Sequence, residues 1–582
     1  MENPAIAALF DEMADLLELD GALVFRVRAY RNAARVIRDV GSPLRELVET
    51  DPKQLTELPG IGKDLAGKIQ ETVTTGDFAD HRDLRAKFPP GLLELLRIQG
   101  LGPKRVKQLY DELHLASPDD LRAAIAQGRL VELRGFGQRS VEKLQEQLEK
   151  AGATAERRFL LADAEQWATA LLKYLGAEKR LRVEAAGSYR RRRETVADLD
   201  ILVAAEPGEA AGDAVTRFVR YPEIQEVLAQ GETKASVRLR GGPQVDLRVV
   251  SPEEHGAALM YFTGSKQHNI ELRKIAQAKD LKLSEYGLFR GERRVAGATE
   301  EEVYAELGLD WIPPELREAR GEIELAARHA LPDLVTLDHI QGELHAHTNA
   351  TDGKASLEEM VDGARKLGYR YLAITDHSKR VTMALGLDER RLREQWAQID
   401  ELNARLDGFT VLKSIELDIL DDGELDLPDD VLAEADYVVA SLHYGASKRE
   451  ADNTKRLVTA ALHPHVDAIG HPTGQLLGRR DPYPLDFDAL VAACLDTGCL
   501  LELNGSPERM DLPDHLAAAA AARGVRFVCS TDAHAVSHLD AMRYAVSIAR
   551  RAGLTKSQVA NAGSLAQLRK ELKHRSPYRP TQ

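Results

Sequence analysis

The stretch Gly342-Glu343-Leu344-His345-Ala346-His347-Thr348 opens the part of the chain whose fold is easiest to predict. Residues two apart on a strand point to the same side, so His345 and His347 share one face. From here to about residue 549, strand-like runs alternate with helical stretches. This alternation predicts a β/α barrel, a fold that places its chemistry at the carboxyl ends of its strands.

Metal-binding residue types fall at or just after the ends of these predicted strands. A lone buried histidine is usually a core residue, but a metal-free core cannot satisfy this many His, Asp and Glu side chains. Because imidazole and carboxylate bind divalent metals in catalytic sites, the pattern indicates a hydrolase. The predicted ligands are His345, His347, Asp352, His377, Glu416, His443, His471, Asp532 and His534.

Length and composition set broad limits. A chain of 582 residues is too long for one core, so we expect roughly three to five domains. Hydrophobic content of 43% with 29% charged residues is typical of a soluble globular protein. No apolar run reaches the roughly 18 residues of a membrane span, and the N-terminus lacks signal-peptide features. With only 3 cysteines and no paired spacing, we expect a cytoplasmic protein without a membrane partner.

The net charge of −15 at first argues against a nucleic-acid partner. Binding depends on where basic groups lie, however, and not on the charge of the whole chain. Basic residues here form local runs at 26–38, 104–107, 190–193 and 290–294, so a DNA partner stays open.

The N-terminal region carries three turns of the form Gly-apolar-Gly, each followed by a basic residue. A glycine turn lets another backbone approach, and the next helix presents free amides to a phosphate. One such turn would be explained by helix packing alone, and the third, at 135–139, could be purely structural. Helical spacing is predicted at 5–17, 30–40, 63–74 and 103–113. The predicted DNA-binding residues are Gly60, Gly62, Lys63, Gly100, Gly102 and Lys104.

A second catalytic pattern stands in the middle of the chain, where strand-like runs replace helices. Asp198 and Asp200 project to one side of a predicted strand, and Asp246 lies on the alternating strand Val245–Val250. An Asp-x-Asp pair alone is usually a solvated strand end. With Gly187-Ser188 upstream as a phosphate-binding turn, three carboxylates that can hold two metal ions indicate nucleotidyl transfer.

These residues resemble a known family when they are taken together with Tyr261-Phe262-Thr263-Gly264-Ser265-Lys266. The middle of the chain resembles the family X DNA polymerases, and the His/Asp/Glu set resembles the PHP (polymerase and histidinol phosphatase) phosphoesterases. The tandem order is similar to that of the bacterial family X polymerases over nearly the whole chain.

The resemblance implies a multidomain α+β and α/β fold. It comprises a helical helix-hairpin-helix region, a nucleotidyltransferase palm with a mixed sheet, a thumb and a distorted, TIM-like β/α PHP barrel. The implied domains are residues 1–85 (helical, DNA-end-binding, lyase type), 86–155 (fingers), 156–258 (palm), 259–316 (thumb), 317–337 (linker) and 338–575 (PHP barrel).

For the palm, the resemblance implies that Asp198, Asp200 and Asp246 bind two catalytic Mg²⁺ or Mn²⁺ ions. Asp246 is also implied to accept the proton of the primer 3′-hydroxyl. The residues implied to bind the incoming nucleotide are Gly187, Ser188, Arg191, Tyr261, Phe262, Gly264 and Asn269.

For the barrel, the resemblance implies three divalent ions of Mn²⁺, Zn²⁺ or Fe²⁺, with Glu416 as a bridge. Asp376 has no place in this scheme and is expected to orient a ligand. Arg479 or Arg480 could clamp a phosphate, or be a solvated loop pair. The implied ligand sets are His345, His347, Glu416 and Asp532; Glu416, His443 and His471; and Asp352, His377 and His534.

Two positions depart from the family pattern. Gln244 stands where eukaryotic relatives often have Arg, so a primer or metal-site contact is expected to be weaker. Lys68 stands where the lyase branch places its Schiff-base lysine, but Asp64 and Asp80 occupy neighbouring positions that are basic in that branch. A possible lyase role for Lys68 is therefore held open beside that of a solvated helix residue.

The sequence thus predicts a DNA polymerase that fills short gaps in repair and has an intrinsic metal-dependent 3′–5′ exonuclease in its barrel. AP-endonuclease and 3′-end processing are further activities of the same cluster. Expected partners are gapped or nicked DNA and deoxynucleoside triphosphates, for a monomer beside the nucleoid. The alternatives are an RNA nucleotidyltransferase of the tRNA-end type and a catalytically silent repair scaffold.

Overall fold

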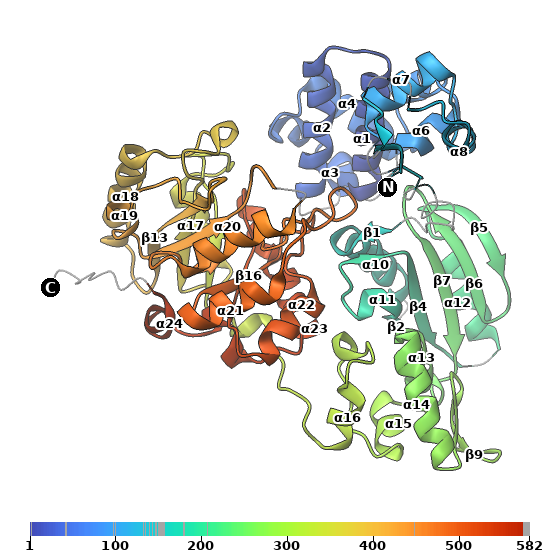
Figure 1. Ribbon diagram of the computed structural model, residues 1–582. Helices are drawn as coiled ribbons and strands as arrows, with labels where there is room; N and C mark the ends of the chain where they lie inside the picture. The colour runs from blue at the N-terminus through green and yellow to red at the C-terminus, as the bar shows by residue number, and fades with distance from the viewer. Residues whose placement is uncertain are drawn as a thin grey trace. The chain divides into compact units, whose positions relative to one another are not determined.

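The described residues form two compact units, Met1–Ala185 with Val196–Val250 and Ala186–Thr195 with Ser251–Gln582. Figure 1 labels their helices and strands along the chain. The computed structural model describes the chain apart from residues 2, 41–43, 97, 99–100, 132, 134, 139, 143, 146–147, 149–157, 178–180, 207, 447–448 and 574–582.

The first unit begins with short helices, which confirms the predicted helical N-terminal region. None of the described helices combines the length and apolar character needed to cross a lipid bilayer. The helices of this region are α1 (Asn3–Leu19), α2 (Val24–Asp39), α3 (Leu44–Thr50), η1 (Pro52–Glu57), α4 (Lys63–Thr75), α5 (Ala79–Arg85), α6 (Pro90–Leu96), α7 (Pro103–Leu113) and α8 (Pro118–Ala126).

The same unit contains the predicted mixed sheet, in the order β2-β4-β7-β6-β5. Strands β4 and β7 are parallel, and the other neighbouring pairs are antiparallel. The elements are β1 (Phe159–Leu160), α10 (Leu161–Gly176), β2 (Arg182–Ala185), β3 (Thr195–Val196), β4 (Asp198–Ala204), α12 (Glu209–Val219), β5 (Ile224–Gln230), β6 (Lys234–Leu239) and β7 (Gln244–Val250).

The second unit starts with helices around a small antiparallel sheet of order β10-β9-β8. The predicted linker at 317–337 contains a helix, α16, whose Ile323 and Ala326 pack into the apolar core of this region. The elements are α11 (Gly187–Arg190), α13 (His255–Thr263), α14 (Lys266–Ala278), β8 (Lys282–Ser284), β9 (Gly287–Arg290), β10 (Arg293–Ala296), α15 (Glu300–Glu306), η2 (Pro314–Leu316) and α16 (Glu322–Ala327).

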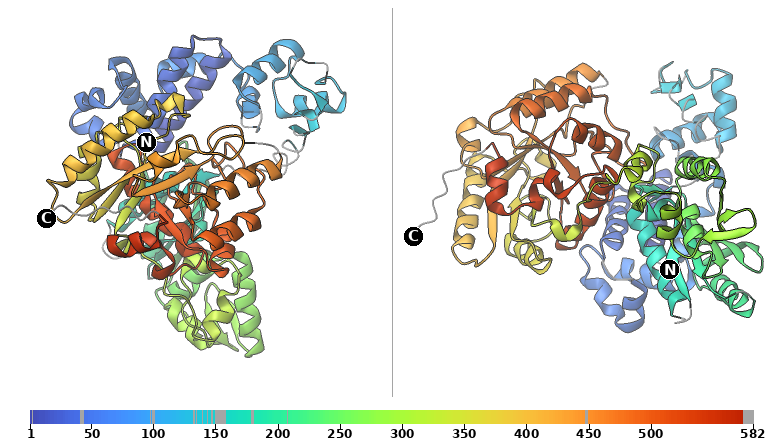
Figure 2. Two further views of the ribbon diagram at one scale, coloured as in Figure 1. Left: turned by 60° about the vertical axis from the view of Figure 1, so that its left-hand side comes forward. Right: turned by 90° about the horizontal axis from the view of Figure 1, so that it is seen from below.

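The rest of this unit is a barrel of seven parallel strands that follow one another in chain order. Every residue of these strands except Thr410 and Lys413 is buried, because helices cover the outside (Figure 2). The strands are β11 (Gly342–Ala346), β12 (Tyr371–Ile374), β13 (Thr410–Asp418), β14 (Tyr437–Ser441), β15 (Ala468–Ile469), β16 (Leu500–Asn504) and β17 (Phe527–Ser530).

Helices and short 3₁₀ turns connect these strands and continue after the last one. They confirm the predicted β/α alternation. They are η3 (Leu337–His339), α17 (Leu357–Lys366), η4 (Thr382–Ala384), α18 (Glu389–Asn403), α19 (Asp429–Leu432), α20 (Glu450–Leu462), α21 (Phe487–Thr497), α22 (Asp514–Ala522), η5 (Val536–Ala541), α23 (Met542–Arg551), η6 (Lys556–Gln558), η7 (Ala560–Ala562) and α24 (Leu565–Glu571).

The barrel closes where β11 meets the segment after β17. The His347 N–H donates to the Ala533 carbonyl at 2.8 Å, and the Ala533 N–H donates to the His345 carbonyl at 3.2 Å. A parallel bridge between Ala346 and Ala533 marks the same junction. The first and last strands therefore present their carboxyl ends side by side.

A buried ion-pair network lies around Glu300 at the start of α15. Its carboxylate accepts two hydrogen bonds from Arg190, at 2.8 and 2.9 Å, and two from Arg317, at 2.7 and 3.1 Å. The indole N–H of Trp311 donates to it at 2.9 Å. Burial raises the pKa of Glu300, but the two guanidinium groups outweigh that effect and lower it to about 2.

Replacing Glu300 with Gln should destabilise the protein, because the buried guanidinium of Arg317 and the partly buried one of Arg190 lose their counter-charge. The cost is about 3–5 kcal/mol at pH 7. A carboxyl whose folded-state pKa is lowered stabilises above its unfolded pKa, near 4.5 here, and loses that effect as the pH falls towards 2. Urea unfolding at several pH values should show the difference between Glu300→Gln and the unmodified protein narrowing below pH 4.5. A difference that does not change with pH would contradict this account.

Candidate functional site

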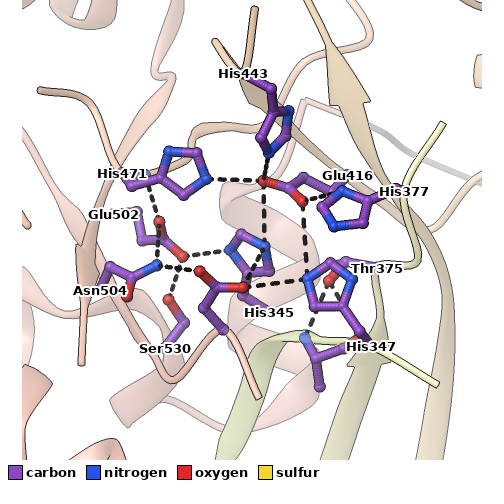
Figure 3. Close-up of polar contacts among 12 residues, drawn as sticks. His345, His347, Thr375, His377, Glu416, His443, His471, Glu502, Asn504 and Ser530 are labelled. Carbon is purple, nitrogen blue, oxygen red and sulfur yellow. Dashed lines mark hydrogen bonds and ion pairs between the residues drawn. The ribbon is translucent and has the colours of Figure 1, made fainter. Parts of the chain in front are cut away.

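Glu416, near the end of β13, is the centre of a cluster of imidazoles inside the barrel (Figure 3). Its Oε1 lies 2.9 Å from His471 Nε2, 3.1 Å from His443 Nε2 and 3.4 Å from His345 Nε2. Its Oε2 lies 2.8 Å from His377 Nδ1 and 3.7 Å from His347 Nε2. The structure thus brings together ligands that the sequence spreads over more than a hundred positions.

The predicted ligands divide into three groups, each with ligand atoms within 4.8 Å of one another. One group is an implied set without Glu416, one adds His347 to an implied set, and one has His377 in place of His471, which belongs to none of the three groups. The groups are His345, His347 and Asp532; His347, Asp352, His377 and His534; and His377, Glu416 and His443.

The donor set fits divalent metal ions. Among the described residues, several buried ligand atoms lie within ion-pair distance of one another but form no hydrogen bond: His345 Nε2, His347 Nε2, His377 Nδ1 and Glu416 Oε2. Leaving such atoms without hydrogen bonds in a protein interior is costly unless a metal binds them. These atoms converge on one region, so the observation supports the predicted metal centre.

The electrostatics of the cluster differ from one imidazole to the next. Burial, with the neighbouring His534 and His377, lowers the pKa of His347 to about 3, so this ring is neutral and ready to bind metal. Burial lowers the pKa of His377 as well, but Glu416 and Asp352 outweigh it and raise the value to about 10. The raised pKa of His377 shows the effect of the negative charges of Glu416 and Asp352, and the same charges would attract a metal cation.

Glu502, on β16, orients the ring of His345 from behind (Figure 3). Its Oε1 lies 2.5 Å from His345 Nδ1 and accepts a hydrogen bond from Ser530 Oγ at 2.5 Å. Asn504 donates to its other oxygen at 3.2 Å. A carboxylate behind a ligating imidazole fixes the ring and raises its basicity. Our sequence analysis missed Glu502, although its position on a barrel strand was a usable signal.

Asp376 and Asp418 hold other parts of the centre in place. Asp376 accepts hydrogen bonds from the Thr348 N–H at 2.8 Å and from the Thr348 hydroxyl at 2.6 Å, so it fixes the loop after β11 rather than a ligand ring. Asp418 Oδ1 lies 3.1 Å from His443 Nδ1 and orients that ring. Asp418 follows Glu416 by two positions on the same strand and was also missed.

One positive charge beside the cluster comes from Arg509. Its Nε lies 3.4 Å from Asp532 Oδ2, and its buried Nη1 has no hydrogen-bond partner among the described residues. Arg479 is exposed and pairs with Glu508 at 3.1 Å. Arg480 donates to the Gly474 carbonyl at 2.8 Å. Arg509 is thus better placed than the predicted Arg479 to meet a phosphate.

The three predicted palm carboxylates meet on one face of the mixed sheet. In the parallel pair of β4 and β7, Asp200 lies opposite Asp246 and Asp198 lies opposite Gln244. Gln244 Nε2 donates to both oxygens of Asp246 at 3.2 Å, and the Ser236 hydroxyl also donates to this carboxylate. Gln244 therefore contacts one of the predicted metal-binding carboxylates, in spite of its departure from the family pattern.

The predicted nucleotide-binding residues belong to the second unit, where Gly187 and Ser188 open α11. Arg191 Nε donates to Glu318 at 3.1 Å and Nη1 donates to the Thr263 carbonyl at 2.5 Å. Gly264 has a φ of +70°, and a Cβ there would lie 3.3 Å from Arg191 Nη1. Glycine therefore suits this turn in both conformation and space.

The aromatic pair, Tyr261 and Phe262, is connected to Asn269 by local contacts. The rings of Tyr261 and Phe262 pack edge to face, with centroids 5.2 Å apart at the end of α13. Asn269 Nδ2 donates to the Tyr261 carbonyl at 2.7 Å, which ties α14 to that end. These three residues form one local group.

The first two glycine turns precede helices as predicted. Gly62 is the N-cap of α4 and Gly102 that of α7, and Gly60 has a φ of +76°. Lys63 and Lys104 are exposed at the first turns of these helices. Gly100 and the basic residue of the third turn, Arg139, lie outside the described residues.

Lys68 pairs with the two carboxylates that break the lyase pattern. Its Nζ lies 2.6 Å from Asp64 and 3.0 Å from Asp80. Burial lowers the pKa of Lys68, but these contacts outweigh it and raise the value. Schiff-base formation needs a neutral amine. The lyase role of Lys68 stays a prediction that this environment disfavours.

Replacing Glu502 with Gln should weaken metal binding by roughly 10–100-fold, because His345 loses the charge that orients its ring. The change keeps the size of the side chain. Metal content per chain, measured by mass spectrometry after dialysis at limiting metal, should fall. Asp488→Asn, on the barrel surface, is the matched control and should keep its metal. Equal metal retention by both variants would rule out this role for Glu502.

Family models match four segments of this chain. Residues 343–487 match the family described as PHP domain, and residues 258–318 match DNA polymerase beta thumb. Residues 1–78 match a helix-hairpin-helix domain, and residues 92–150 match a SAM-like helix-hairpin-helix tandem. Both halves of the predicted tandem are therefore present.

Individual relatives agree with this division. The DNA polymerase/3'-5' exonuclease PolX of Bacillus subtilis (strain 168) is 39% identical over 579 residues, which cover 98% of this chain and 100% of the relative. DNA polymerase lambda of Arabidopsis thaliana is 26% identical over 298 residues, 45% of this chain and 53% of the relative. A probable phosphatase of Thermoanaerobacter sp. (strain X514) is 28% identical over 249 residues, 40% of this chain and 96% of the relative. The chain belongs to the bacterial family X DNA polymerases that carry a C-terminal PHP domain.

Proposed function

We propose that this chain fills short gaps in DNA during repair and removes nucleotides from 3′ ends with its barrel. The observation that carries the proposal is the presence of two separate acidic centres in one chain. One is the face of β4 and β7 that bears Asp198, Asp200 and Asp246, and the other is the imidazole cluster around Glu416. Similarity to PolX over the whole chain supports the assignment of synthesis to the first and exonuclease to the second.

At the sheet, Asp198, Asp200 and Asp246 would hold two Mg²⁺ or Mn²⁺ ions, which supply charge neutralisation at the attacking hydroxyl and the triphosphate. Asp246 would accept the proton of the primer 3′-hydroxyl. Its hydrogen bonds from Gln244 and Ser236 fix the carboxylate for that task. Gly187, Ser188 and Arg191 would bind the triphosphate through amides, a hydroxyl and a guanidinium. Tyr261 and Phe262 would contact the sugar.

In the barrel, three divalent ions of Mn²⁺, Zn²⁺ or Fe²⁺ would supply an acidified water and stabilise the leaving oxygen. Glu416 would bridge two of them, as its contacts with five imidazoles suggest. Arg509 would orient the scissile phosphate beside Asp532. The same arrangement suits AP-endonuclease and other 3′-end processing, because each cleaves a phosphodiester.

Binding of gapped or nicked DNA would use the exposed Lys63 and Lys104 beside the first two glycine turns. The amides at the start of α4 and α7 would meet phosphates there without reading sequence. We propose a monomer that works in the cytoplasm beside the nucleoid, with deoxynucleoside triphosphates as the second substrate.

A primer-extension assay separates this proposal from a tRNA-end or other RNA nucleotidyltransferase. We expect extension of DNA primers at short gaps and none of tRNA ends. Extension confined to tRNA would overturn the proposal. A chain that binds gapped DNA but neither extends nor degrades it would instead be a repair scaffold.

Two substitutions test whether the centres are separate. Asp200→Ala should lower the rate of synthesis by more than about 100-fold, because a shared metal ligand is lost. The same variant should still degrade single-stranded 3′ ends at the rate of the unmodified protein. His345→Ala should do the reverse. Both activities are measured on the same labelled primer, with circular dichroism to confirm folding. Loss of both activities in either folded variant would refute the two-centre account.

A further inference from the structure

The turn that carries Arg191 is held by the end of barrel helix α23, although Arg191 and Arg551 stand 360 positions apart. Both segments belong to the second compact unit. Arg551 Nη1 donates to the Arg191 carbonyl oxygen at 2.7 Å. The Arg551 side chain is only 2% exposed, so this contact is shielded from water. A buried charged hydrogen bond of this kind fixes backbone position strongly.

The same guanidinium shares a carboxylate with the side chain of Arg191. Glu318 Oε1 accepts from Arg551 Nη1 at 3.0 Å and from Arg191 Nε at 3.1 Å. Arg551 Nη2 donates to Asp514, the first residue of α22, at 2.6 Å. Arg551 is thus anchored in the barrel by Asp514 and reaches both the backbone and the counter-ion of Arg191.

The next residue of the turn is held by the same helix. Arg192 Nε donates to Ser547 Oγ at 3.1 Å, and its guanidinium lies 5.8 Å from the ring centroid of Tyr544. Arg192 has a φ of +57°, a conformation that costs energy in a residue with a side chain and therefore needs support from its surroundings. Helix α23 supplies that support.

We propose that Arg551 is a positioning residue for nucleotide binding, so that the exonuclease barrel forms part of the polymerase's triphosphate site. This inference rests on the proposed role of Arg191. Without Arg551, the Arg191 carbonyl loses its buried donor, and Glu318 pairs with Arg191 alone. The first change loosens the turn, and the second draws the Arg191 guanidinium and its charge away from the phosphates.

The expected effect falls on nucleotide binding and not on hydrolysis. Among the described residues, the hydrogen-bond partners of Arg551 are Arg191, Glu318 and Asp514, none of which is a predicted metal ligand. Binding of the triphosphate in the ground state depends on the charge of Arg191. When the loss of Arg551 displaces Arg191, KM for the nucleotide should therefore rise more than kcat falls.

The test is the steady-state incorporation of one deoxynucleoside triphosphate into DNA with a one-nucleotide gap, using the full chain. Arg551→Gln should raise KM for the nucleotide roughly tenfold and change kcat by less than about twofold. Exonuclease rate and metal content should stay as in the unmodified protein. Arg551→Lys keeps the charge but not the planar guanidinium. Its KM should lie between those of Arg551→Gln and the unmodified protein.

The neighbouring Arg550 is the matched control. It lies on the same helix, pairs with Glu315 at 2.7 Å and donates to the Val335 carbonyl at 3.1 Å, but makes no described contact with the turn at 186–195. Arg550→Gln should therefore leave KM unchanged. A rise in KM equal to that of Arg551→Gln would show a general loosening of the barrel and would overturn the proposal.

A double-mutant cycle tests the shared carboxylate. Arg551→Gln should raise KM less in a Glu318→Gln background than alone, because the counter-ion that would draw Arg191 away is already gone. Fully additive effects would overturn this part of the proposal.

The remaining outcomes separate this inference from the proposed function. An unchanged KM in folded Arg551→Gln, or an equal loss of kcat, exonuclease rate and thermal stability, would overturn the positioning role alone. If Arg191→Gln leaves KM unchanged, the triphosphate role of Arg191 falls, and the inference with it. An unmodified chain that extends no gapped DNA would overturn the proposed polymerase itself.

Discussion

Closure of the barrel between its first strand and the segment after its last strand is the constraint on which the metal centre depends. The two hydrogen bonds between β11 and Ala533 bring His345 and His347 beside Asp532 and His534. Glu416, from the middle of the barrel sequence, contacts His345 through one carboxylate oxygen and His377 through the other. Because the ligands come from nearly every strand, the cluster exists only when the ring of strands is complete.

The ligands themselves could be predicted because each follows a strand, and a β/α barrel gathers the carboxyl ends of its strands at one place. The residues that orient them could not be predicted in the same way. Glu502 meets His345 across 157 positions, and only the pairing of strands reveals that contact. The division into metal sets also needed the structure, since His347 and His377 each join two groups.

In the palm, the alternation of Val245–Val250 identified Asp246 as a candidate third carboxylate, because strand period can be read from sequence. That Asp246 lies opposite Asp200 follows from the register of β4 and β7, which the sequence does not give. The contacts of Arg191 lay beyond that reasoning, because they involve Glu318, at the start of the predicted linker, and Arg551, at the end of α23. A pattern within one segment gives no information on such distant partners.

The position of the closing segment has a consequence for newly made chains. Synthesis runs from the N-terminus, and domains fold as they leave the ribosome, so the mixed sheet is complete long before Asp532 and His534 emerge. A chain interrupted anywhere before β17 lacks one side of the metal cluster. The cluster in the barrel is therefore completed after the mixed sheet during translation, and products that end before Asp532 lack two of its predicted ligands.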